Sequence, residues 1–290
     1  MKSRPACYPC FVKQGLAALR LSTPDPALQK RAIEEMMRRL QGLDLERSPS
    51  FLSRIPYDVA REITGVADPF GPAKRETNRL ALALVPALRR KIAAALDPLH
   101  MAIKAALSGN VIDLGIGHPF DLERDAMRIT DNPITLDHYE AFAKLLGQCR
   151  RLLYICDNAG EIAFDCLLVE QLKQRCEVTA SVKSGPIIND ATMEDARAVG
   201  LTDLVRVIKT GSDHIGVEWE YASAEFRKAF ASADLILAKG QGNFETLNER
   251  PDEIFFLLKA KCPEVADEIG VKDGDTIFLQ GRRQKRNTAG

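Results

Sequence analysis

The first third of the chain has the spacing of apolar residues that is typical of helices. Within 26–40, apolar side chains recur every three or four positions, and a shorter helix is predicted over 58–64. The stretch 74–107 is rich in Ala, Leu, Arg and Lys, but Pro86 and Pro98 interrupt it. Because an interior proline removes a backbone donor and clashes with the preceding turn, we expect two or three successive helices there.

Beyond residue 134 the pattern changes, and short apolar runs alternate with amphipathic stretches. Short apolar runs are typical of buried strands, and amphipathic stretches with a period near 3.6 are typical of helices. Strands are predicted at 152–156, 178–182, 204–208, 234–238, 254–258 and 276–279. Helices are predicted at 135–146, 161–175, 193–198 and 222–230. This alternation indicates βα units in a mostly parallel sheet, and hence an α/β fold.

These patterns predict how the chain is organised. An N-terminal all-helical part is expected over 1–109, with the break at Ser108-Gly109-Asn110. An α/β catalytic domain is expected over 110–281. The remaining residues, 282–290, are polar and basic, and we expect a flexible tail.

Composition narrows the class of protein. Lys and Arg total 40 and Asp and Glu total 40, so the formal net charge is zero and no broad attraction to nucleic acid or anionic lipid is implied. No stretch approaches the roughly 20 apolar residues that cross a bilayer, and no signal peptide is recognisable. Seven scattered cysteines favour a reducing compartment over a disulfide framework. We therefore expect a cytoplasmic protein that binds neither nucleic acid nor membranes; its oligomeric state is left open.

Polar loops follow four of the predicted strands, at 157–161, 183–192, 210–213 and 239–243. The carboxyl ends of parallel strands share one edge of a sheet, where ligands bind near a switch in strand order. The loops supply carboxylates and carboxamides, which suit Mg²⁺ or Mn²⁺. They also supply Lys239 and glycine-flanked backbone N–H groups, which suit an anion such as phosphate. Each loop alone is equally typical of a cap or turn, but four at one edge predict a site.

Five motifs occur in order along the chain. They are Cys7-x-x-Cys10, Gly109-Asn110-x-x-Asp113, Asp157-Asn158-Ala159-Gly160-Glu161, Gly185-Pro186-x-x-Asn189-Asp190-Ala191-Thr192 and Lys239-Gly240-x-Gly242-Asn243. Their combination resembles the damage-control phosphatase family, DUF89, whose metal-binding domain is also named for an acidic-residue methyltransferase. The chain is most similar to the short stand-alone microbial branch, over nearly its whole length. The resemblance implies a three-layer α/β/α domain with an N-terminal helical part, and metal-dependent hydrolysis of small phosphomonoesters such as sugar phosphates or damaged phosphometabolites.

The resemblance also implies roles for the acidic motif residues. Asp157, Asn158 and Asp190 would hold a divalent metal, with Mg, Mn, Co and Ni as the candidates. The metal would neutralise the phosphoryl oxygens and activate a water, whose proton Glu161 or Asp190 would accept. A covalent mechanism with Asp157 as the nucleophile is disfavoured, because such phosphatases usually carry a second Asp two residues on, where this chain has Ala159.

A second group of motif residues is implied to bind phosphate. Lys239 and the loop from Gly240 to Asn243 would hold it and offset charge that spreads over its oxygens. Ser184 stands where many relatives would have a second glycine. Its hydroxyl either donates to the phosphate or fills the turn.

The roles of a third group stay open. Asn110 and Asp113 either contact substrate and phosphate or anchor the junction between the two parts of the chain. His118 either protonates a leaving group or is an ordinary loop histidine, which we favour. Cys7 and Cys10 have the spacing of half a zinc site or a redox pair, and a structural role or a transient disulfide is favoured.

Two rival functions remain. An S-adenosylmethionine-dependent carboxyl methyltransferase is disfavoured, because the sequence lacks a G-x-G-x-x-G turn with a following acidic residue. A non-catalytic phosphometabolite-binding protein would bind the same ligands without releasing phosphate. Phosphate release therefore separates the last alternative from a phosphatase.

Overall fold

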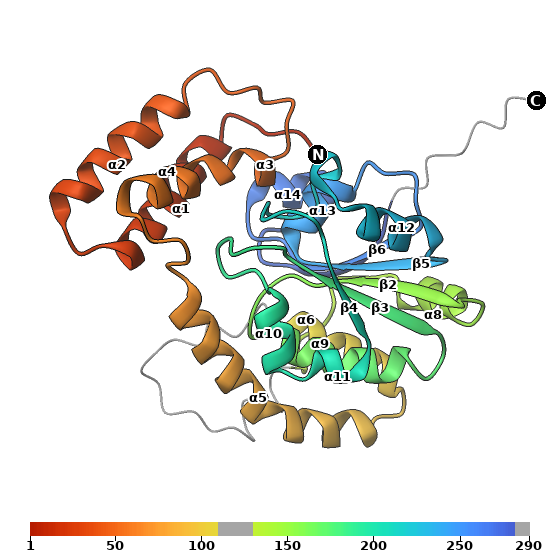
Figure 1. The fold of residues 1–290 in the computed structure, drawn as a ribbon. Coiled ribbons are helices and arrows are strands. Elements are labelled where there is room, and N and C mark those ends of the chain that lie inside the picture. Colours follow the sequence, from red (N-terminus) through yellow and green to blue (C-terminus); the bar gives the residue numbers. More distant parts are fainter. Residues whose placement is uncertain (110–129, 282–290) are drawn as a thin grey trace, which may run out of the picture.

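The computed structural model describes residues 1–109 and 130–281 (Figure 1). The predictions for Asn110, Asp113, His118 and the tail 282–290 lie outside the described residues. In the described ranges one sheet has the strand order β1-β7-β6-β5-β2-β3-β4. Its strands are β1 (Leu136–Asp137), β2 (Arg151–Ile155), β3 (Glu177–Val182), β4 (Arg206–Lys209), β5 (Leu235–Lys239), β6 (Ile254–Lys259) and β7 (Thr276–Gln280). All neighbours run parallel except β6 and β7, which confirms the predicted mostly parallel sheet.

Helices cover both faces of this sheet, because its strands are apolar on both sides. In β2, Leu152 and Tyr154 enter one core, whereas Leu153 and Ile155 enter the other. The first core is covered by α5 (Gly71–Ala93), α6 (Pro98–Ser108), α8 (Tyr139–Leu146), α9 (Glu161–Leu172), α10 (Met193–Ala198) and α11 (Leu201–Leu204). The second is covered by α12 (Ala224–Ser232), α13 (Gln241–Leu247) and α14 (Pro263–Ile269) (Figure 1). The predicted three-layer fold is confirmed.

The first four helices form a separate lobe beside the sheet, which we call the helical lobe (Figure 1). They are α1 (Cys7–Ser22), α2 (Pro26–Arg39), α3 (Pro49–Leu52) and α4 (Arg54–Thr64). The apolar core of the lobe is built around residues such as Leu19, Met36 and Val59. Ile187 and Ile215, from the loops after β3 and β4, join this core. None of the helices within 1–109 and 130–281 is both long and apolar enough to cross a bilayer.

Helices α5 and α6 leave the helical lobe and join the α/β layers. Leu84 and Leu88 of α5 and Ile103 of α6 share a core with the sheet. Both helices pack on α9, which follows the central strand β2. The predicted boundary at 109/110 therefore falls after helices that already belong to the α/β core.

Three predicted elements differ from the structure. Helix α5 runs through Pro86 without a break, because Pro86 is exposed and Leu82, whose carbonyl loses its amide partner, is also on the solvent side. The predicted helix 135–146 begins instead with β1, where Leu136 pairs with Ile277 of β7. The predicted strand 204–208 is shifted, since 204 ends α11 and β4 begins at 206.

Candidate active site

The candidate site lies where the strand order switches direction. From β2 the chain moves outward to β3 and β4, and then returns to β5 on the other side of β2. A crevice at the carboxyl ends of two such strands is the usual ligand position in an open α/β sheet. Ile155 pairs with Ala238 across β2 and β5, so the loops that begin with Asp157 and Gly240 lie side by side.

Gly240 makes close contact with the carboxylate of Asp157. Its backbone has φ 81° and ψ 162°, a region that is essentially restricted to glycine. A Cβ atom added there would lie 1.9 Å from Asp157 Oδ2. Both the backbone conformation and the space next to Asp157 therefore require glycine.

Backbone hydrogen bonds join the loop after β2 to the loop after β3. Ala191 N donates to Asp157 O at 2.7 Å, and Ala159 N donates to Asn189 O at 2.8 Å. An isolated antiparallel bridge forms between Asn158 and Asp190. The backbone alone thus fixes the three predicted metal ligands next to one another.

The side chains of this acid cluster, which we define as Asp157, Asn158, Glu161 and Asp190, are all buried. Asn158 Nδ2 donates to Asp157 Oδ2 at 2.6 Å and to Glu161 Oε2 at 3.3 Å. Burial raises the pKa of Asp157 well above its usual range, and the charges of Asp190 and Glu161 raise it further. Burial and the neighbouring carboxylates therefore disfavour the ionised form of Asp157 unless a cation lies beside it.

Asp190 has the least satisfied carboxylate of the acid cluster. Neither of its oxygens has a hydrogen-bond partner among the described residues. Lys183 Nζ lies 3.4 Å from Asp190 Oδ2 and donates to the backbone oxygen of Gly216. Burial raises the pKa of Asp190 to about 6, although the charge of Lys183 opposes that shift. A buried carboxylate without hydrogen bonds is costly unless a cation or a proton compensates it.

These features fit a hard divalent cation. Oxygen atoms of two carboxylates and one carboxamide are ligands that suit Mg²⁺ or Mn²⁺. Within the described ranges no three or more His, Cys, Asp and Glu side chains are grouped so as to hold a metal. That absence does not exclude this ligand set, because the third oxygen would come from Asn158, which is not one of those four residue types.

Lys239 occupies a different place from the predicted one. Its ammonium is fully buried beneath the acid cluster and donates to Ala106 O at 3.0 Å, to Asp165 Oδ1 at 2.7 Å and to Glu161 Oε1. Burial would lower the pKa of Lys239, but the charges of Asp165 and Glu161 outweigh burial and raise it. All three ammonium protons have acceptors, so this structure does not present Lys239 to a phosphate.

Polar residues of α5 and α10, which the sequence analysis did not single out, support the loops from behind. Asn78 Oδ1 accepts from Gly160 N at 2.6 Å, and Asn78 Nδ2 donates to Asp195 Oδ1 at 2.9 Å. Lys74, one turn earlier, forms a buried ion pair with Asp195 at 2.8 Å. The i, i+4 spacing of Lys74 and Asn78 puts both on one helix face, which was the available signal.

Comparison with known proteins identifies the family. The profile described as "Damage-control phosphatase ARMT1-like domain" matches residues 3–277. The chain belongs to the ARMT1-like damage-control phosphatase family. A damage-control phosphatase of Pyrococcus horikoshii is 36% identical over 97% of this chain and 99% of its own length. A damage-control phosphatase of Archaeoglobus fulgidus is 34% identical over 96% of this chain and 98% of its own.

Comparison with solved structures identifies the same family. The crystal structure of a DUF89 family protein from Pyrococcus horikoshii aligns with a TM-score of 0.91 at 36% identity, covering 97% of this chain and all of that one. An uncharacterised protein of Methanocaldococcus jannaschii is also 36% identical, over 97% of this chain and 96% of its own. The resemblance inferred from the motifs is thus confirmed, and it extends along the whole phosphatase domain.

In this phosphatase fold the remaining predicted phosphate ligands have structural contacts. Asn243 Nδ2 donates to Lys239 O at 2.6 Å and to Cys156 O at 3.2 Å, which braces β5 against β2. Asn243 Oδ1 is buried and has no hydrogen-bond partner in the described part of the chain. Ser184 Oγ accepts from Gly211 N at 2.8 Å, so its hydroxyl joins two loops. This contact uses the Ser184 oxygen only as an acceptor, so it fits the turn-filling alternative and still allows the hydroxyl to donate to a phosphate.

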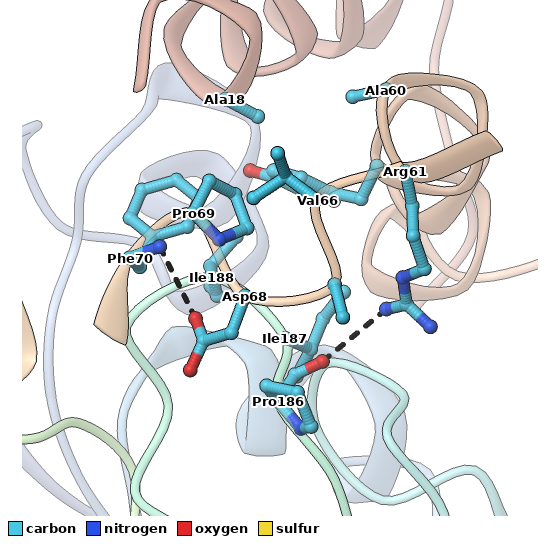
Figure 2. A pocket seen from close by; sticks show the side chains of 12 residues that line it. Ala18, Ala60, Arg61, Val66, Asp68, Pro69, Phe70, Pro186, Ile187 and Ile188 are labelled. Carbon is cyan, nitrogen blue, oxygen red and sulfur yellow. Dashed lines mark hydrogen bonds between the residues drawn. The ribbon is translucent and has the colours of Figure 1, made fainter. Parts of the chain in front are cut away.

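The helical lobe is tied to the loop that carries Asp190. Figure 2 shows Arg61 of α4 donating to the backbone oxygen of Pro186, at 3.3 Å. A cavity of about 20 Å³, enough for one water, lies between the helical lobe and this loop. Ile188, which lines this cavity, has φ 39°, a strained conformation for a β-branched residue. Strain two residues before Asp190 is typical of a functional loop.

A larger cavity, of about 490 Å³, lies between the helical lobe and the loops at the sheet edge. We call it the lobe cavity. Asn189, Gln241 and Gly242 line it, so it adjoins the loops of the acid cluster. Lys261 also lines it and is exposed, and its charge lowers the pKa of Asp157. The sequence analysis missed Lys261, which follows β6 at the same edge of the sheet.

Proposed function

We propose that this chain is a divalent-metal-dependent phosphatase that hydrolyses small phosphomonoesters, such as sugar phosphates or damaged phosphometabolites. The observation that carries the proposal is the pair of buried Asp190 oxygens, which accept no hydrogen bond from the described part of the chain, beside Asp157 and Asn158 at the switch point. Family membership supports the reaction class, since two similar relatives are named damage-control phosphatases. We further propose that the protein works in the cytoplasm, because all seven cysteines are free thiols.

In this proposal Asp157, Asn158 and Asp190 hold the cation, which is Mg²⁺, Mn²⁺, Co²⁺ or Ni²⁺. Asn158 Nδ2 already donates to two carboxylates, so its amide oxygen is the atom that would hold the cation. When bound, the cation supplies neutralisation of the phosphoryl oxygens and a lower pKa for the attacking water. Glu161 positions Asn158 and keeps Lys239 neutralised, and does not itself contact the ester.

The phosphate requires a cation from the protein as well, and we assign this role to Lys261 instead of Lys239. Lys261 lines the lobe cavity next to the acid cluster, whereas Lys239 is enclosed by three acceptors. Lys261 would offset charge on the equatorial phosphoryl oxygens in the transition state.

A proton must leave the attacking water, and we assign it to Asp190. Neither Asp190 oxygen accepts a hydrogen bond from the described residues, although Lys183 is ion-paired with Oδ2, so one oxygen could receive the proton while the other holds the cation. Glu161 is the weaker candidate, because its carboxylate already accepts from Asn158 and Lys239.

Release of inorganic phosphate from p-nitrophenyl phosphate and a panel of sugar phosphates tests the proposal. We expect activity that thorough chelation with EDTA removes and that Mg²⁺, Mn²⁺, Co²⁺ or Ni²⁺ restores. Asp157→Asn should lower kcat by at least about 100-fold while the melting temperature stays near that of the parent protein. The exposed Asp273→Asn is the matched control and should retain full activity.

Two results would contradict this proposal. One is turnover that persists after thorough chelation, which would exclude the cation from the reaction. The other is tight binding of a sugar phosphate without phosphate release under any of the metals, which would instead identify a binding protein.

A further inference from the structure

The lobe cavity is placed to receive the part of a ligand that extends beyond the acid cluster. It is bounded by α1 and the start of α4, by the loop before Asp190 and by the start of α13. Tyr57 lines it, and Asp190 contributes to the raised pKa of the Tyr57 hydroxyl, after burial. Its volume of about 490 Å³ lies within the range of pockets that enclose small molecules.

The surface of the lobe cavity is mostly formed by apolar side chains. They come from the helical lobe, the segment before α5, the loops after β3 and β4, and α14, and include Ala6, Phe11, Phe70, Ile188, Ile215 and Val265. Three free thiols, of Cys7, Cys10 and Cys262, also line it, and thiols are weak hydrogen-bonding groups. Such walls favour burial of apolar ligand surface.

The polar groups of the walls are largely engaged with one another. Ser50 Oγ donates to Glu245 Oε2 at 2.6 Å, and Gln241 Nε2 donates to Glu245 Oε1 at 2.8 Å. Tyr57 Oη donates to Gln14 Oε1 at 3.1 Å. A ligand hydroxyl buried against the apolar side chains would lose its hydrogen bonds to water without a replacement, which is costly.

Two exposed polar side chains, those of Asn189 and Lys261, belong to the end that adjoins the acid cluster, and Lys13 of α1 is a third exposed polar side chain in the lining. Asn189 directly precedes Asp190, and the charge of Lys261 acts on both Asp157 and Asp190. The lobe cavity therefore has one end suited to a phosphate and walls suited to an apolar group.

We propose that the lobe cavity binds the non-phosphate part of the substrate, and that this part is an apolar alkyl or aryl group instead of a polyhydroxylated sugar. The inference rests on the proposed function, because it assigns the phosphate end to the acid cluster. Within the proposed range of phosphomonoesters, it selects those of apolar alcohols.

The test uses alkylphosphonates, which bind without turnover. Affinities of methyl-, propyl- and hexylphosphonate are measured by calorimetry in the presence of Mn²⁺. Each buried methylene should tighten binding by about fourfold until the cavity is filled. Propylphosphonate should bind more tightly than 2,3-dihydroxypropylphosphonate, which has the same length and charge. A series that does not change with chain length, or tighter binding of the dihydroxylated ligand, would overturn the inference.

A variant that fills the lobe cavity tests whether the dependence of affinity on chain length arises there. Ala17 is an exposed residue of α1 that lines the lobe cavity, so Ala17→Trp should fill it and flatten the chain-length series. Ala83→Trp, at an exposed position of α5 that does not line the cavity, is the matched control and should retain the parent series. A chain-length series that persists unchanged in Ala17→Trp would contradict the location.

Failure of this inference is distinct from failure of the proposed function. Tight binding of the longer phosphonates without phosphate release from phenyl phosphate would support the cavity and refute the phosphatase. Release of phosphate with equal preference for sugar and phenyl phosphates would support the phosphatase and refute the cavity assignment.

Discussion

Replacing Gly240 by alanine tests how the acid cluster is positioned. The added Cβ would lie 1.9 Å from Asp157 Oδ2, whereas an ordinary contact is at least 3.4 Å. The carboxylate must therefore withdraw by about 1.5 Å, or the loop after β5 must move by a similar amount. Displacement of a reacting group by about 1 Å can cost about 100-fold in rate. We expect Gly240→Ala to lower kcat by at least that factor and to weaken cation binding.

The variant should also be less stable. An alanine at φ 81° and ψ 162° adds strain of about 1–3 kcal/mol to the folded state. Gly270→Ala is the matched control, because Gly270 also has a positive φ, of 87°, but an added Cβ meets nothing within 4 Å. Gly270→Ala should cost about 1–2 kcal/mol and leave turnover unchanged.

Three measurements distinguish the effect of the contact with Asp157 from the effect of backbone strain at position 240. Urea unfolding gives the free energy of unfolding, phosphate release gives kcat and KM, and calorimetric titration with Mn²⁺ gives cation affinity. The reasoning is refuted if Gly240→Ala matches Gly270→Ala in all three, because the position of Asp157 would then not depend on Gly240.

Three further predictions concern the surroundings of the acid cluster. Lys239→Met leaves the buried carboxylates of Glu161 and Asp165 without their cation, so it should lower the free energy of unfolding by about 3–5 kcal/mol. If the variant lost turnover while its stability was unchanged, Lys239 would instead contact the phosphate. Asn78→Ala removes the acceptor of Gly160 N, so it should lower the free energy of unfolding in urea by about 1–3 kcal/mol and should lower kcat. A variant as stable as the parent protein would show that the Asn78–Gly160 hydrogen bond does not support the loop. Because burial raises the pKa of Asp190 to about 6, above its unfolded value near 4, the metal-free protein should lose stability as pH rises from about 4 through 6. Cation binding needs the ionised carboxylate, so Mn²⁺ affinity should weaken as pH falls through about 6; calorimetry showing constant affinity from pH 5 to 7.5 would contradict this assignment.

The sequence predicted the sheet and the position of the acid cluster well. The strands are short apolar runs buried on both faces, and such runs are recognisable without any tertiary information. Asp157 and Asp190 then follow strands that are neighbours in the sheet, so the topology brings them together. Their positions directly after strands were sufficient to predict that the two residues lie together, because the carboxyl ends of parallel strands share one edge of the sheet.

The orientation of the charged side chains could not be predicted in the same way. Lys239 follows the same rule of position, but its side chain points beneath the cluster, towards Asp165 on α9. Whether a lysine at a strand end faces solvent or a buried carboxylate depends on a helix that packs there, which periodicity does not reveal. The same limit explains why Asn78 was missed, since its partner Gly160 is 82 residues away.

Pro86 illustrates a third limit. The rule that proline ends a helix assumes that the lost hydrogen bond is costly, yet here the affected turn faces solvent while Leu84 and Leu88 pack into the core. Burial of the opposite face outweighs the local penalty. Local rules are overridden wherever tertiary packing contributes more free energy than the local conformation.

Because the Asp190 oxygens accept no hydrogen bond within 1–109 and 130–281, the thermal stability of the protein should report on the ion that we propose binds there. A ligand that binds only the folded state adds RT ln(1 + [L]/Kd) to the free energy of unfolding, about 2.7 kcal/mol at 100 times Kd. For a chain of this size that corresponds to a rise of several degrees in the melting temperature. A melting screen over divalent ions would therefore rank them by affinity before any substrate is known, and adding candidate phosphate esters to the best ion would then rank the substrates.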